Sequence, residues 1–583
     1  KGEKFSPWLG LLRRFEIIYV AGSERDIIGV RNKSIMTKEE LLELANILLP
    51  NVDKDISYYQ NIYKTRNCNF VSRFAPSPTG YMHIGGIYQV LIAEKFVHQN
   101  DGIFFLRIED TDKKREIEGA FEKVLQAFDK FGISYDEGPI SNDLEKGNYG
   151  PYIQSKREEI YQTFVKHLIK NGLAYPCFMS EDEINETRNY QQKNKLVPGI
   201  YGEFSKYRDA SIDEVKKHLS KGSPFVIRFR SPGILNNRII VNDIVRGSVE
   251  TNDNFIDIVL LKSIGMPTYH LAHVVDDYLM GTTHVVRADE RFASVPLHIQ
   301  LFNSFGFEPP IYVHTSPLLK QEGNSKRKLS KRKDPEADLE YYYKDGYPIF
   351  SIIDYLYTII DSFYEDWKKE NPGKNFNDYK IDLGRLSISG ALLNIDKLKF
   401  LANDYLSSLN TLELYNQGLL WTKEYDAELY NLMIEHEEYT INALNIERHI
   451  EKDPKRFTLY TDLKPQLELF YDETYNSKRN NIELPVLANK DLLVKLYDFY
   501  SSNYTIDLDK IQWFDLMKQF ASKNNFALNN QEFKSGNYIG KVGDVAMILR
   551  LVLMGSKVTP DLWESMKVLG KDRVLERMKK FIE

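Results

Sequence analysis

Cysteine is scarce in this sequence, and long apolar runs are missing. Only Cys68 and Cys177 occur among 583 residues. Two cysteines are too few for a disulfide framework and fit a reducing compartment. No stretch reaches the roughly 18 consecutive apolar residues that a membrane-spanning helix needs. We therefore expect neither a disulfide-stabilised secreted domain nor a membrane protein, and no membrane partner.

Charge of one sign does not dominate the chain either. Lys and Arg number 77 against 83 Asp and Glu, a formal net charge of −6. Any polyanionic partner must therefore be bound by local basic patches rather than by the net charge. Hydrophobic residues make up 42% and charged residues 27%, which is usual for a globular protein and excludes a disordered chain. At roughly 150 residues per domain, the length predicts about four structural units.

The first 349 residues alternate strand patterns with amphipathic helix patterns, which predicts a parallel α/β sheet with insertions. The alternation opens with a βαβ unit, whose elements are expected at residues 70–74, 85–97 and 103–108. Ahead of it, Thr37 and Glu40 have the spacing of a capping box and predict a helix start. Further strands are expected at residues 224–229, 257–261, 284–287 and 311–315.

The rest of the chain is expected to be mostly α-helical. Strand patterns become rare after residue 349, and helices are predicted at residues 354–363, 392–409 and 545–554. The segments 427–451 and 476–534 show only generic helix and loop patterns, which we interpret as insertions. The 37 tyrosines and the many Asn and Lys residues favour an A+T-rich coding genome.

A Pro- and Gly-rich loop leads from the first predicted strand into the first helix. It reads Arg-Phe-Ala-Pro-Ser-Pro-Thr-Gly-Tyr-Met-His-Ile-Gly-Gly from Arg73 to Gly86. Gly85 and Gly86 at a helix start let an anion approach the backbone amides, and His83 can donate a hydrogen bond to a phosphate oxygen. Taken alone, the pattern fits a nucleotide site and an ordinary tight turn equally well.

Two further charged segments follow predicted strands. Arg-Ile-Glu-Asp-Thr-Asp at residues 107–112 lies at a strand end, where open α/β sheets bind ligands, although such a cluster is by itself typical of a solvated turn. Residues 326–333 contain six basic side chains among eight, a pattern that is by itself typical of a solvated loop or a targeting patch. Neither segment alone decides between a site and a surface.

Together these segments resemble the class I aminoacyl-tRNA synthetases, in particular the bacterial and organellar glutamyl-tRNA synthetases. Residues 74–80, Phe-Ala-Pro-Ser-Pro-Thr-Gly, match the run that precedes the HIGH-like tetrad of that family. Ser77 and Thr79 favour glutamyl over glutaminyl enzymes, which carry Glu in place of the serine. The fourth tetrad position is Gly86 rather than His, so His83 must serve alone. Residues 328–332 resemble the KMSKS-like loop, with Leu329 in place of Met.

The resemblance implies an α/β fold, with a Rossmann-like parallel-sheet catalytic domain that carries insertions and a mostly α-helical anticodon-binding domain after it. It implies a glutamate–tRNA ligase that uses ATP, with Mg²⁺, to convert L-glutamate to glutamyl adenylate. The glutamyl group then passes to the 3′-terminal adenosine of tRNA-Glu, and family members commonly need bound tRNA before they activate glutamate. The expected parts are an N-terminal extension at 1–66, the first half of the catalytic domain at 67–175, an inserted acceptor-stem-binding domain at 176–255, the second half of the catalytic domain with the KMSKS-like loop at 256–345, a stem-contact helical domain at 346–410 and the anticodon-binding domain at 411–583.

The resemblance also assigns roles to individual residues. Glu109 is expected to hold the α-ammonium of glutamate, while Arg287 and Tyr269, assisted by Arg73, bind its side-chain carboxylate. The full set expected to contact glutamate is Arg73, Ser77, Glu109, Tyr269, His273 and Arg287, with His273 standing where the family often has Asn. The catalytic residues are expected to be His83, Lys328 and Lys331. The ATP-binding set is expected to be His83, Gly85, Gly86, Glu290, Lys328, Leu329, Ser330, Lys331 and Arg332.

No metal-ligating residue and no structural zinc are expected. Some family members carry a Cys-x-Cys pair at the position of Cys177, but Met179 occupies the second place here. One thiolate without three further ligands cannot build a tetrahedral zinc site. A small buried thiol is the expected role of Cys177.

Two other functions remain open at this stage. A relative that glutamylates a tRNA base lacks the anticodon-binding half, whereas this chain has a long helical half. A non-catalytic tRNA-binding scaffold would be expected to lose some of His83, Glu109, Arg287 or Lys331, and all four are present.

The choice of tRNA and the cellular compartment are also open. Charging of tRNA-Gln, which would require a partner amidotransferase, is undecided, and a monomer is expected. Because the chain starts at Lys1 rather than Met, we expect a targeting peptide to have been removed. A plastid such as an apicoplast, or a mitochondrion, is the expected compartment, with a bacterial cytoplasm as the alternative.

Overall fold

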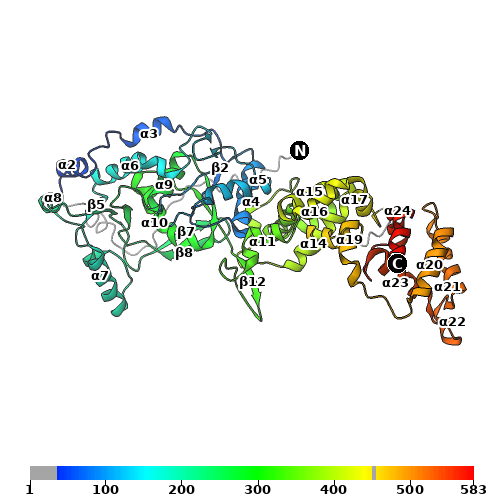
Figure 1. Ribbon diagram of the computed structural model, residues 1–583. Coiled ribbons are helices and arrows are strands. Elements are labelled where there is room, and N and C mark those ends of the chain that lie inside the picture. The colour runs from blue at the N-terminus through cyan, green and yellow to red at the C-terminus, as the bar shows by residue number, and fades with distance from the viewer. Residues whose placement is uncertain (1–35, 449–454) are drawn as a thin grey trace, which may run out of the picture. The chain divides into compact units, whose positions relative to one another are not determined.

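The computed structural model describes residues 36–448 and 455–583 (Figure 1). The chain forms two compact units. Unit 1 consists of Lys1–Leu339 and Leu356–Leu393, and unit 2 of Glu340–Tyr355 and Asn394–Glu583. The first 35 residues, with any remnant of a targeting segment, lie outside the described residues.

The βαβ unit that opens the expected sheet is confirmed. Strand β1 (Val71–Phe74) pairs in parallel with β2 (Ile103–Leu106), and α4 (Ile84–His98) connects them. Strand β1 also lies beside β10 (His284–Ala288), where the amide of Val71 donates to Thr283 Oγ1 at 2.8 Å. A parallel connection of this kind requires a crossover, which the apolar α4 provides while it covers the strands.

Three more strands continue the layer. Strand β11 (Ile311–Thr315) pairs in parallel with β10 along its whole length and with β7 (Arg238–Asp243) at one position, Tyr312 opposite Asp243. Strand β8 (Gly247–Asn252) then pairs antiparallel with β7. The carboxyl ends of β1, β2 and β10 carry the segments that the sequence marks as candidate site segments, as expected for an open α/β sheet.

A separate antiparallel sheet is formed by three strands whose residues lie between β2 and β10 in the sequence. It consists of β5 (Ala174–Cys177), β6 (Val226–Phe229) and β9 (Val259–Leu261). The remaining helices and longer strands of unit 1 are α5 (Ala120–Lys130), α7 (Glu181–Lys193), α8 (Ile212–Ser220), α9 (Tyr269–Leu279), α10 (Val295–Phe305), β12 (Leu318–Glu322), β13 (Ser325–Lys328) and α13 (Tyr364–Glu370).

The first described helices belong to the core of unit 1. Helix α2 (Lys38–Leu48) begins with the expected capping box, in which the amide of Glu40 donates to Thr37 and the amide of Thr37 donates to Glu40. It packs against α6 (Glu158–Lys170), and α3 (Ile56–Ile62) follows it. The buried ammonium of Lys166 donates to the carbonyls of Leu49 and Val52 at 3.0 and 2.9 Å. Residues 38–62 therefore pack into the core of unit 1.

The helical character of unit 2 is confirmed. Helices α11 (Leu339–Lys344) and α12 (Ile349–Ile360) cross the points at which the chain changes unit. The others are α14 (Ile395–Ser408), α15 (Thr411–Tyr425), α16 (Ala427–Glu435), α17 (Glu437–Leu444), α18 (Leu463–Leu467), α19 (Asp472–Lys478), α20 (Lys490–Asn503), α21 (Lys510–Lys523), α22 (Asn530–Ser535), α23 (Val542–Met554) and α24 (Leu562–Lys579). After residue 349, the strands in the described residues are the two-residue pieces β14 (Ala391–Leu392), β15 (Phe526–Ala527) and β16 (Gly540–Lys541).

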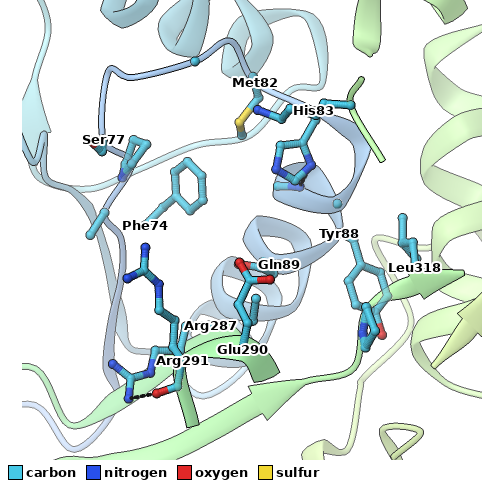
Figure 2. A pocket seen from close by; sticks show the side chains of 18 of the residues that line it. Phe74, Ser77, Met82, His83, Tyr88, Gln89, Arg287, Glu290, Arg291 and Leu318 are labelled. Carbon is cyan, nitrogen blue, oxygen red and sulfur yellow. Dashed lines mark hydrogen bonds between the residues drawn. The ribbon is translucent and has the colours of Figure 1, made fainter. Parts of the chain in front are cut away.

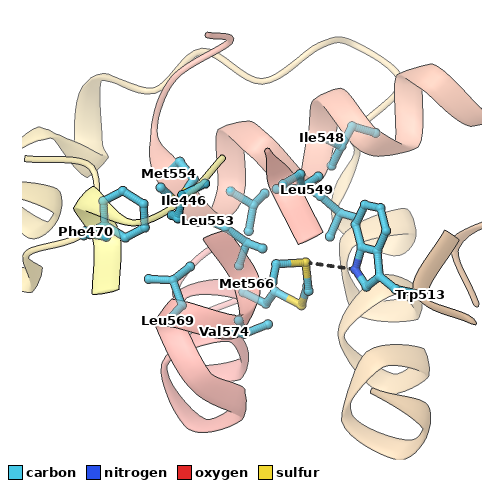
Figure 3. Packing of buried hydrophobic residues seen from close by; sticks show 14 of the residues in the cluster. Ile446, Phe470, Trp513, Ile548, Leu549, Leu553, Met554, Met566, Leu569 and Val574 are labelled. Atoms are coloured by element: carbon cyan, nitrogen blue, oxygen red, sulfur yellow. Dashed lines mark hydrogen bonds between the residues drawn. The ribbon is translucent and has the colours of Figure 1, made fainter. Parts of the chain in front are cut away.

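One apolar core runs through unit 2. Trp513 of α21 lies against Met566 of α24, and its indole nitrogen donates to the sulfur at 3.4 Å (Figure 3). The fully buried Arg577 donates to the carbonyls of Leu469, Phe470 and Leu553 and to Asp472. It therefore links α24 to α23 and to the segment between α18 and α19. The segments 427–448 and 476–534, interpreted from the sequence as insertions, supply helices to this same core.

Candidate active site

The loop between β1 and α4 is shaped around a histidine cap. His83 is the N-cap of α4, and its Nδ1 accepts from the amide of Gly86 at 3.2 Å. A Cβ at residue 85 would lie 3.0 Å from that Nδ1, and a Cβ at residue 86 would lie 3.0 Å from Met82 Sδ. Glycine at 85 therefore lets the histidine ring lie close against the first helical turn, where the amides carry partial positive charge, and glycine at 86 leaves room for Met82.

A pocket of about 490 Å³ opens beside this turn (Figure 2). Most of the expected site residues line it, and they come from the β1–α4 loop, the ends of β2 and β10, the start of α9 and the β13 loop. The expected residues on its wall are Arg73, Ser77, His83, Gly85, Gly86, Glu109, Tyr269, Arg287, Glu290, Lys328, Leu329 and Lys331. His273, Ser330 and Arg332 lie outside this lining, whereas Tyr88, Gln89 and Arg291 belong to it without having been expected.

Two arginines and two carboxylates form a buried network at one side of the pocket. The carboxylate of Asp277 accepts from Arg73 Nε at 3.2 Å and from Arg107 Nη1 at 2.7 Å, and Glu109 accepts from Arg107 Nη2 at 2.9 Å. Burial alone would raise the pKa of Asp277, but Arg73 and Arg107 hold it below its usual value. Burial is the larger effect on Glu109 and raises its pKa, although Arg107 opposes the shift. A cationic group in the pocket would add a second partner for Glu109.

Arg287 is buried and held from several sides. Its Nε donates to His314 Nε2 at 2.9 Å, its Nη1 to Tyr269 Oη at 3.2 Å, and its Nη2 to the carbonyl of Arg291 at 3.2 Å. The guanidinium carbon also lies 4.8 Å from the centre of the Tyr312 ring. No carboxylate is among these partners, so the guanidinium keeps its positive charge available to the pocket.

His273 lies behind the pocket wall rather than on it. Its side chain is fully buried, and its ring stacks on Tyr269 with centroids 5.8 Å apart. Its Nδ1 lies 3.0 Å from Asp277 Oδ2 and its Nε2 lies 3.4 Å from Tyr312 Oη. Burial, together with Arg287, holds the pKa of His273 well below its usual value, so the ring is neutral at pH 7. The helical position of His273, one turn after Tyr269 in α9, points it into the core.

The basic loop after β13 reaches across to the loop that precedes α4. Lys331 Nζ donates to the carbonyl of Tyr81 at 2.7 Å, and Lys328 forms an ion pair with Glu290. Burial and the nearby Lys331 and Lys328 lower the pKa of His83 to about 4, so this ring is neutral at pH 7. Two lysine ammonium groups and a neutral hydrogen-bonding ring thus lie at one end of the pocket.

A buried aspartate fixes the base of that loop. Asp334 accepts from Arg327 Nη1 and Nη2 at 2.6 and 2.7 Å and from the amide of Ser330 at 2.9 Å. Ser330 therefore holds the loop from outside the pocket lining, where Arg332 also lies.

The sequence analysis missed the supporting residues of the site, chiefly Asp277, Arg107, His314, Asp243 and Asp334. Two consecutive aspartates inside the apolar run of α9 were a usable signal, because unpaired charges are rarely buried. His314 and Asp243 gave no such local signal, since their contact joins residues 71 positions apart.

The described residues contain no group of three or more His, Cys, Asp or Glu side chains that could hold a metal ion. Cys177 is buried in β5 with a free thiol. Within the same residues, no helix combines the length and apolarity needed to cross a membrane.

Comparisons with known proteins agree with this architecture. Residues 69–366 match the family model described as tRNA synthetases class I (E and Q), catalytic domain, and residues 428–582 match an anticodon binding domain. A glutamate–tRNA ligase of Clostridium perfringens is 42% identical over 545 residues, which cover 92% of this chain and 99% of the relative. One of Acetivibrio thermocellus is 40% identical, with 93% and 99% covered. Since each match leaves fewer than 66 residues of this chain uncovered, it extends into the segment 1–66 that the sequence analysis treats as an N-terminal extension.

Solved structures give the same picture. The crystal structure of a glutamate tRNA ligase from Elizabethkingia meningosepticum, in complex with its amino acid, superposes with a TM-score of 0.69 at 28% identity. The similarity covers 88% of this chain and 99% of that one. The glutamate–tRNA synthetase of Elizabethkingia anophelis gives a TM-score of 0.66 at 27% identity.

Proposed function

The chain belongs to the class I tRNA synthetases, within the glutamate–tRNA ligases, and on this premise we propose how its pocket activates glutamate. The enzyme uses ATP as a substrate, converts L-glutamate to glutamyl adenylate, and passes the glutamyl group to the terminal adenosine of tRNA-Glu. One observation carries the assignment of the site. A single pocket is lined by a buried carboxylate, Glu109, a buried guanidinium, Arg287, and an ammonium group, Lys331.

The glutamate end of the pocket is built on charge. Glu109 receives the α-ammonium, and Arg287, with the hydroxyl of Tyr269 3.2 Å from its Nη1, receives the side-chain carboxylate. Arg73 adds positive charge behind them, held by Asp277, and Ser77 lines the same wall. Glutamine would leave the guanidinium without its anion, a loss that a buried site penalises by several kcal/mol, roughly 10³-fold or more.

The ATP end supplies position and cations rather than an acid or a base. An oxygen of the α-carboxylate of glutamate attacks the α-phosphorus of ATP. The bond from that phosphorus to the oxygen that bridges it to the β-phosphorus breaks, and pyrophosphate leaves. Lys331 and Lys328 stabilise the charge that develops on the leaving phosphates. The amide of Gly85 and the neutral ring of His83 hold the phosphates at the start of α4, while the amide of Gly86 donates to His83 Nδ1 and orients that ring.

The remaining ATP contacts follow from their places around the pocket. Glu290 and Leu329 line the wall near Lys328 and are proposed to contact the ribose and adenine. Ser330 acts through the shape of the loop, because its amide donates to Asp334. Mg²⁺ is proposed to arrive with ATP, because such ions are usually held by substrate phosphates and water with few protein ligands.

Partners and compartment are further proposals. The helical unit 2 is proposed to read the anticodon, and the enzyme to act as a monomer. If tRNA-Gln is also charged, a partner amidotransferase must convert the product. On composition alone, we propose location in a plastid or mitochondrion, which imaging of the tagged full-length protein would test against a bacterial cytoplasm.

Charging of radiolabelled glutamate onto separate tRNA-Glu and tRNA-Gln transcripts tests the function. The wild-type enzyme should charge tRNA-Glu, whereas Lys331→Ala and Arg287→Ala should lose most of the activity. The tRNA-Gln reaction decides whether an amidotransferase must follow. If neither tRNA accepts glutamate, the ligase function is refuted.

A further inference from the structure

We propose that His314, oriented by Asp243, is a positioning residue that holds Arg287 for the side-chain carboxylate of glutamate and thereby sets the preference for glutamate over glutamine. This inference rests on the proposed function of the pocket. His314 is 1% exposed and does not line the pocket, so it acts through Arg287 and not by touching the substrate.

Three neighbouring strands bring the residues into one row. Arg287 and His314 are direct partners in the parallel pairing of β10 with β11. Asp243 ends β7, where it is the partner of Tyr312, two residues before His314. The row therefore follows from the sheet register, and a shift of either strand by one residue would turn its side chains to the other face.

The hydrogen bonds fix one tautomer of His314. The carboxylate of Asp243 cannot donate, so His314 Nδ1, 2.7 Å from Asp243 Oδ2, must carry the proton. Arg287 Nε is a donor, so His314 Nε2, 2.9 Å away, must present its lone pair. Burial lowers the pKa of His314, although the hydrogen bond from His314 to Asp243 opposes the shift, and the ring stays neutral.

Asp243 is itself held rigidly. Its Oδ1 accepts from the amides of Val245 and Arg246, both at 3.0 Å, and its Oδ2 also accepts from the amide of His314 at 3.1 Å. These contacts hold the carboxylate of Asp243 in one orientation, and its hydrogen bond with Nδ1 in turn orients the imidazole of His314. Second-layer hydrogen bonds of this kind commonly decide how well a binding group is oriented.

The consequence for Arg287 concerns which of its donors face the substrate. Arg287 Nε donates to His314, and Nη1 lies 3.2 Å from Tyr269 Oη and 3.5 Å from His298 Nδ1. One Nη2 hydrogen goes to the carbonyl of Arg291, so these contacts leave the second Nη2 hydrogen for a ligand. Without an acceptor at Nε, the long side chain gains alternative rotamers and a buried donor loses its partner. Glutamate binding should weaken, while ATP, at the other end of the pocket, should bind as before.

Two matched substitutions separate positioning from simple packing. His314→Gln places an amide oxygen near the former Nε2 and can still accept from Arg287. His314→Asn places its amide near the former Nδ1, so it can contact Asp243 but not reach Arg287. We expect the KM for glutamate to rise roughly tenfold or more in His314→Asn and to stay within about threefold in His314→Gln. The KM for ATP should stay within about twofold in both.

The preference for glutamate over glutamine, measured as the ratio of kcat/KM values, should fall only in His314→Asn. Equal behaviour of the two variants, or a rescue by Asn instead of Gln, would overturn the inference. Arg287→Ala is the control for the proposed function. If it leaves the KM for glutamate unchanged, the pocket assignment itself fails, whereas an effect of Arg287→Ala without one of His314→Asn refutes only the role of His314.

A measurement on the wild-type protein covers the case in which a variant does not fold. Nitrogen NMR of ¹⁵N-histidine-labelled protein reports the tautomer of His314 directly. The spectrum of His314→Gln assigns the His314 signals where that variant folds. Otherwise, selective ¹⁵N labelling at position 314 assigns them. We expect a protonated Nδ1 and an unprotonated Nε2 at pH 7. A protonated Nε2 would refute the proposed hydrogen bond from Arg287.

Discussion

Asp277→Asn removes one charge from the network that holds Arg73 and Arg107. The Asp277 and Arg107 side chains are 0% exposed and that of Arg73 is 5% exposed, so both ion pairs lie in a poorly solvated region. Asparagine keeps the shape of the side chain but leaves the guanidinium groups short of a counter-charge. Breaking a buried pair in this way costs about 3–5 kcal/mol. We expect the lower end, about 3 kcal/mol, because Arg107 keeps its ion pair with Glu109 at 2.9 Å.

That loss should be visible in thermal unfolding. With an unfolding entropy of about 2.1 cal/mol/K per residue, about 3 kcal/mol corresponds to a drop of roughly 4 °C in the melting temperature of a unit of this size. Asp366→Asn is the matched control, because Asp366 and its partner Lys369 are 72% and 75% exposed. An exposed pair contributes at most about 1 kcal/mol, so the control should melt within roughly 1 °C of wild type.

Calorimetry of the wild-type, Asp277→Asn and Asp366→Asn proteins in one buffer measures the three melting temperatures and tests the prediction. The KM for glutamate should also rise in Asp277→Asn, since Arg73 loses its anchor beside the pocket. Equal melting temperatures for Asp277→Asn and Asp366→Asn would refute the view that the buried network stabilises unit 1.

The remaining predictions concern the loop, the ATP end and acid stability. Lys331→Ala should lower the kcat for ATP–pyrophosphate exchange roughly 10²-fold, as for loss of one transition-state contact, while exchange by the exposed-site control Lys326→Ala stays within about twofold. Glu290→Gln should raise the KM for ATP roughly tenfold and leave that for glutamate unchanged, which steady-state kinetics would check. Burial lowers the pKa of both His270 and His284 to about 4. Between pH 6.5 and 4 the unfolded chain therefore binds more protons than the folded chain, and the free energy of unfolding should fall as the pH falls. A melting temperature that is flat across this window would contradict the prediction.

The parts of the site that depend on local chemistry could be predicted from the sequence. The loop before α4 follows from its prolines and glycines, and the helix start at Thr37 follows from the capping box. The basic character of residues 326–333 was equally plain, although the ion pair of Lys328 with Glu290 was not. Each of these features is encoded within a few residues.

The supporting contacts could not be predicted in the same way. Asp243 meets His314 only because β7, β11 and β10 are neighbours, and strand order is a property of the whole sheet. The burial of α2 against α6 likewise depends on a pairing between distant segments. His273 was expected on the pocket wall from its motif, but the helical turn that separates it from Tyr269 carries it into the core behind that residue.

Activation of glutamate in this pocket is the central claim, and ATP–pyrophosphate exchange tests it most directly. The reaction should be run with tRNA-Glu present, with glutamate or glutamine as the amino acid, and with wild-type and Arg287→Ala enzyme. We predict exchange by wild type with glutamate, roughly 10³-fold less with glutamine, and a large loss with glutamate in Arg287→Ala. Equal exchange with the two amino acids, or full activity in Arg287→Ala, would contradict the account.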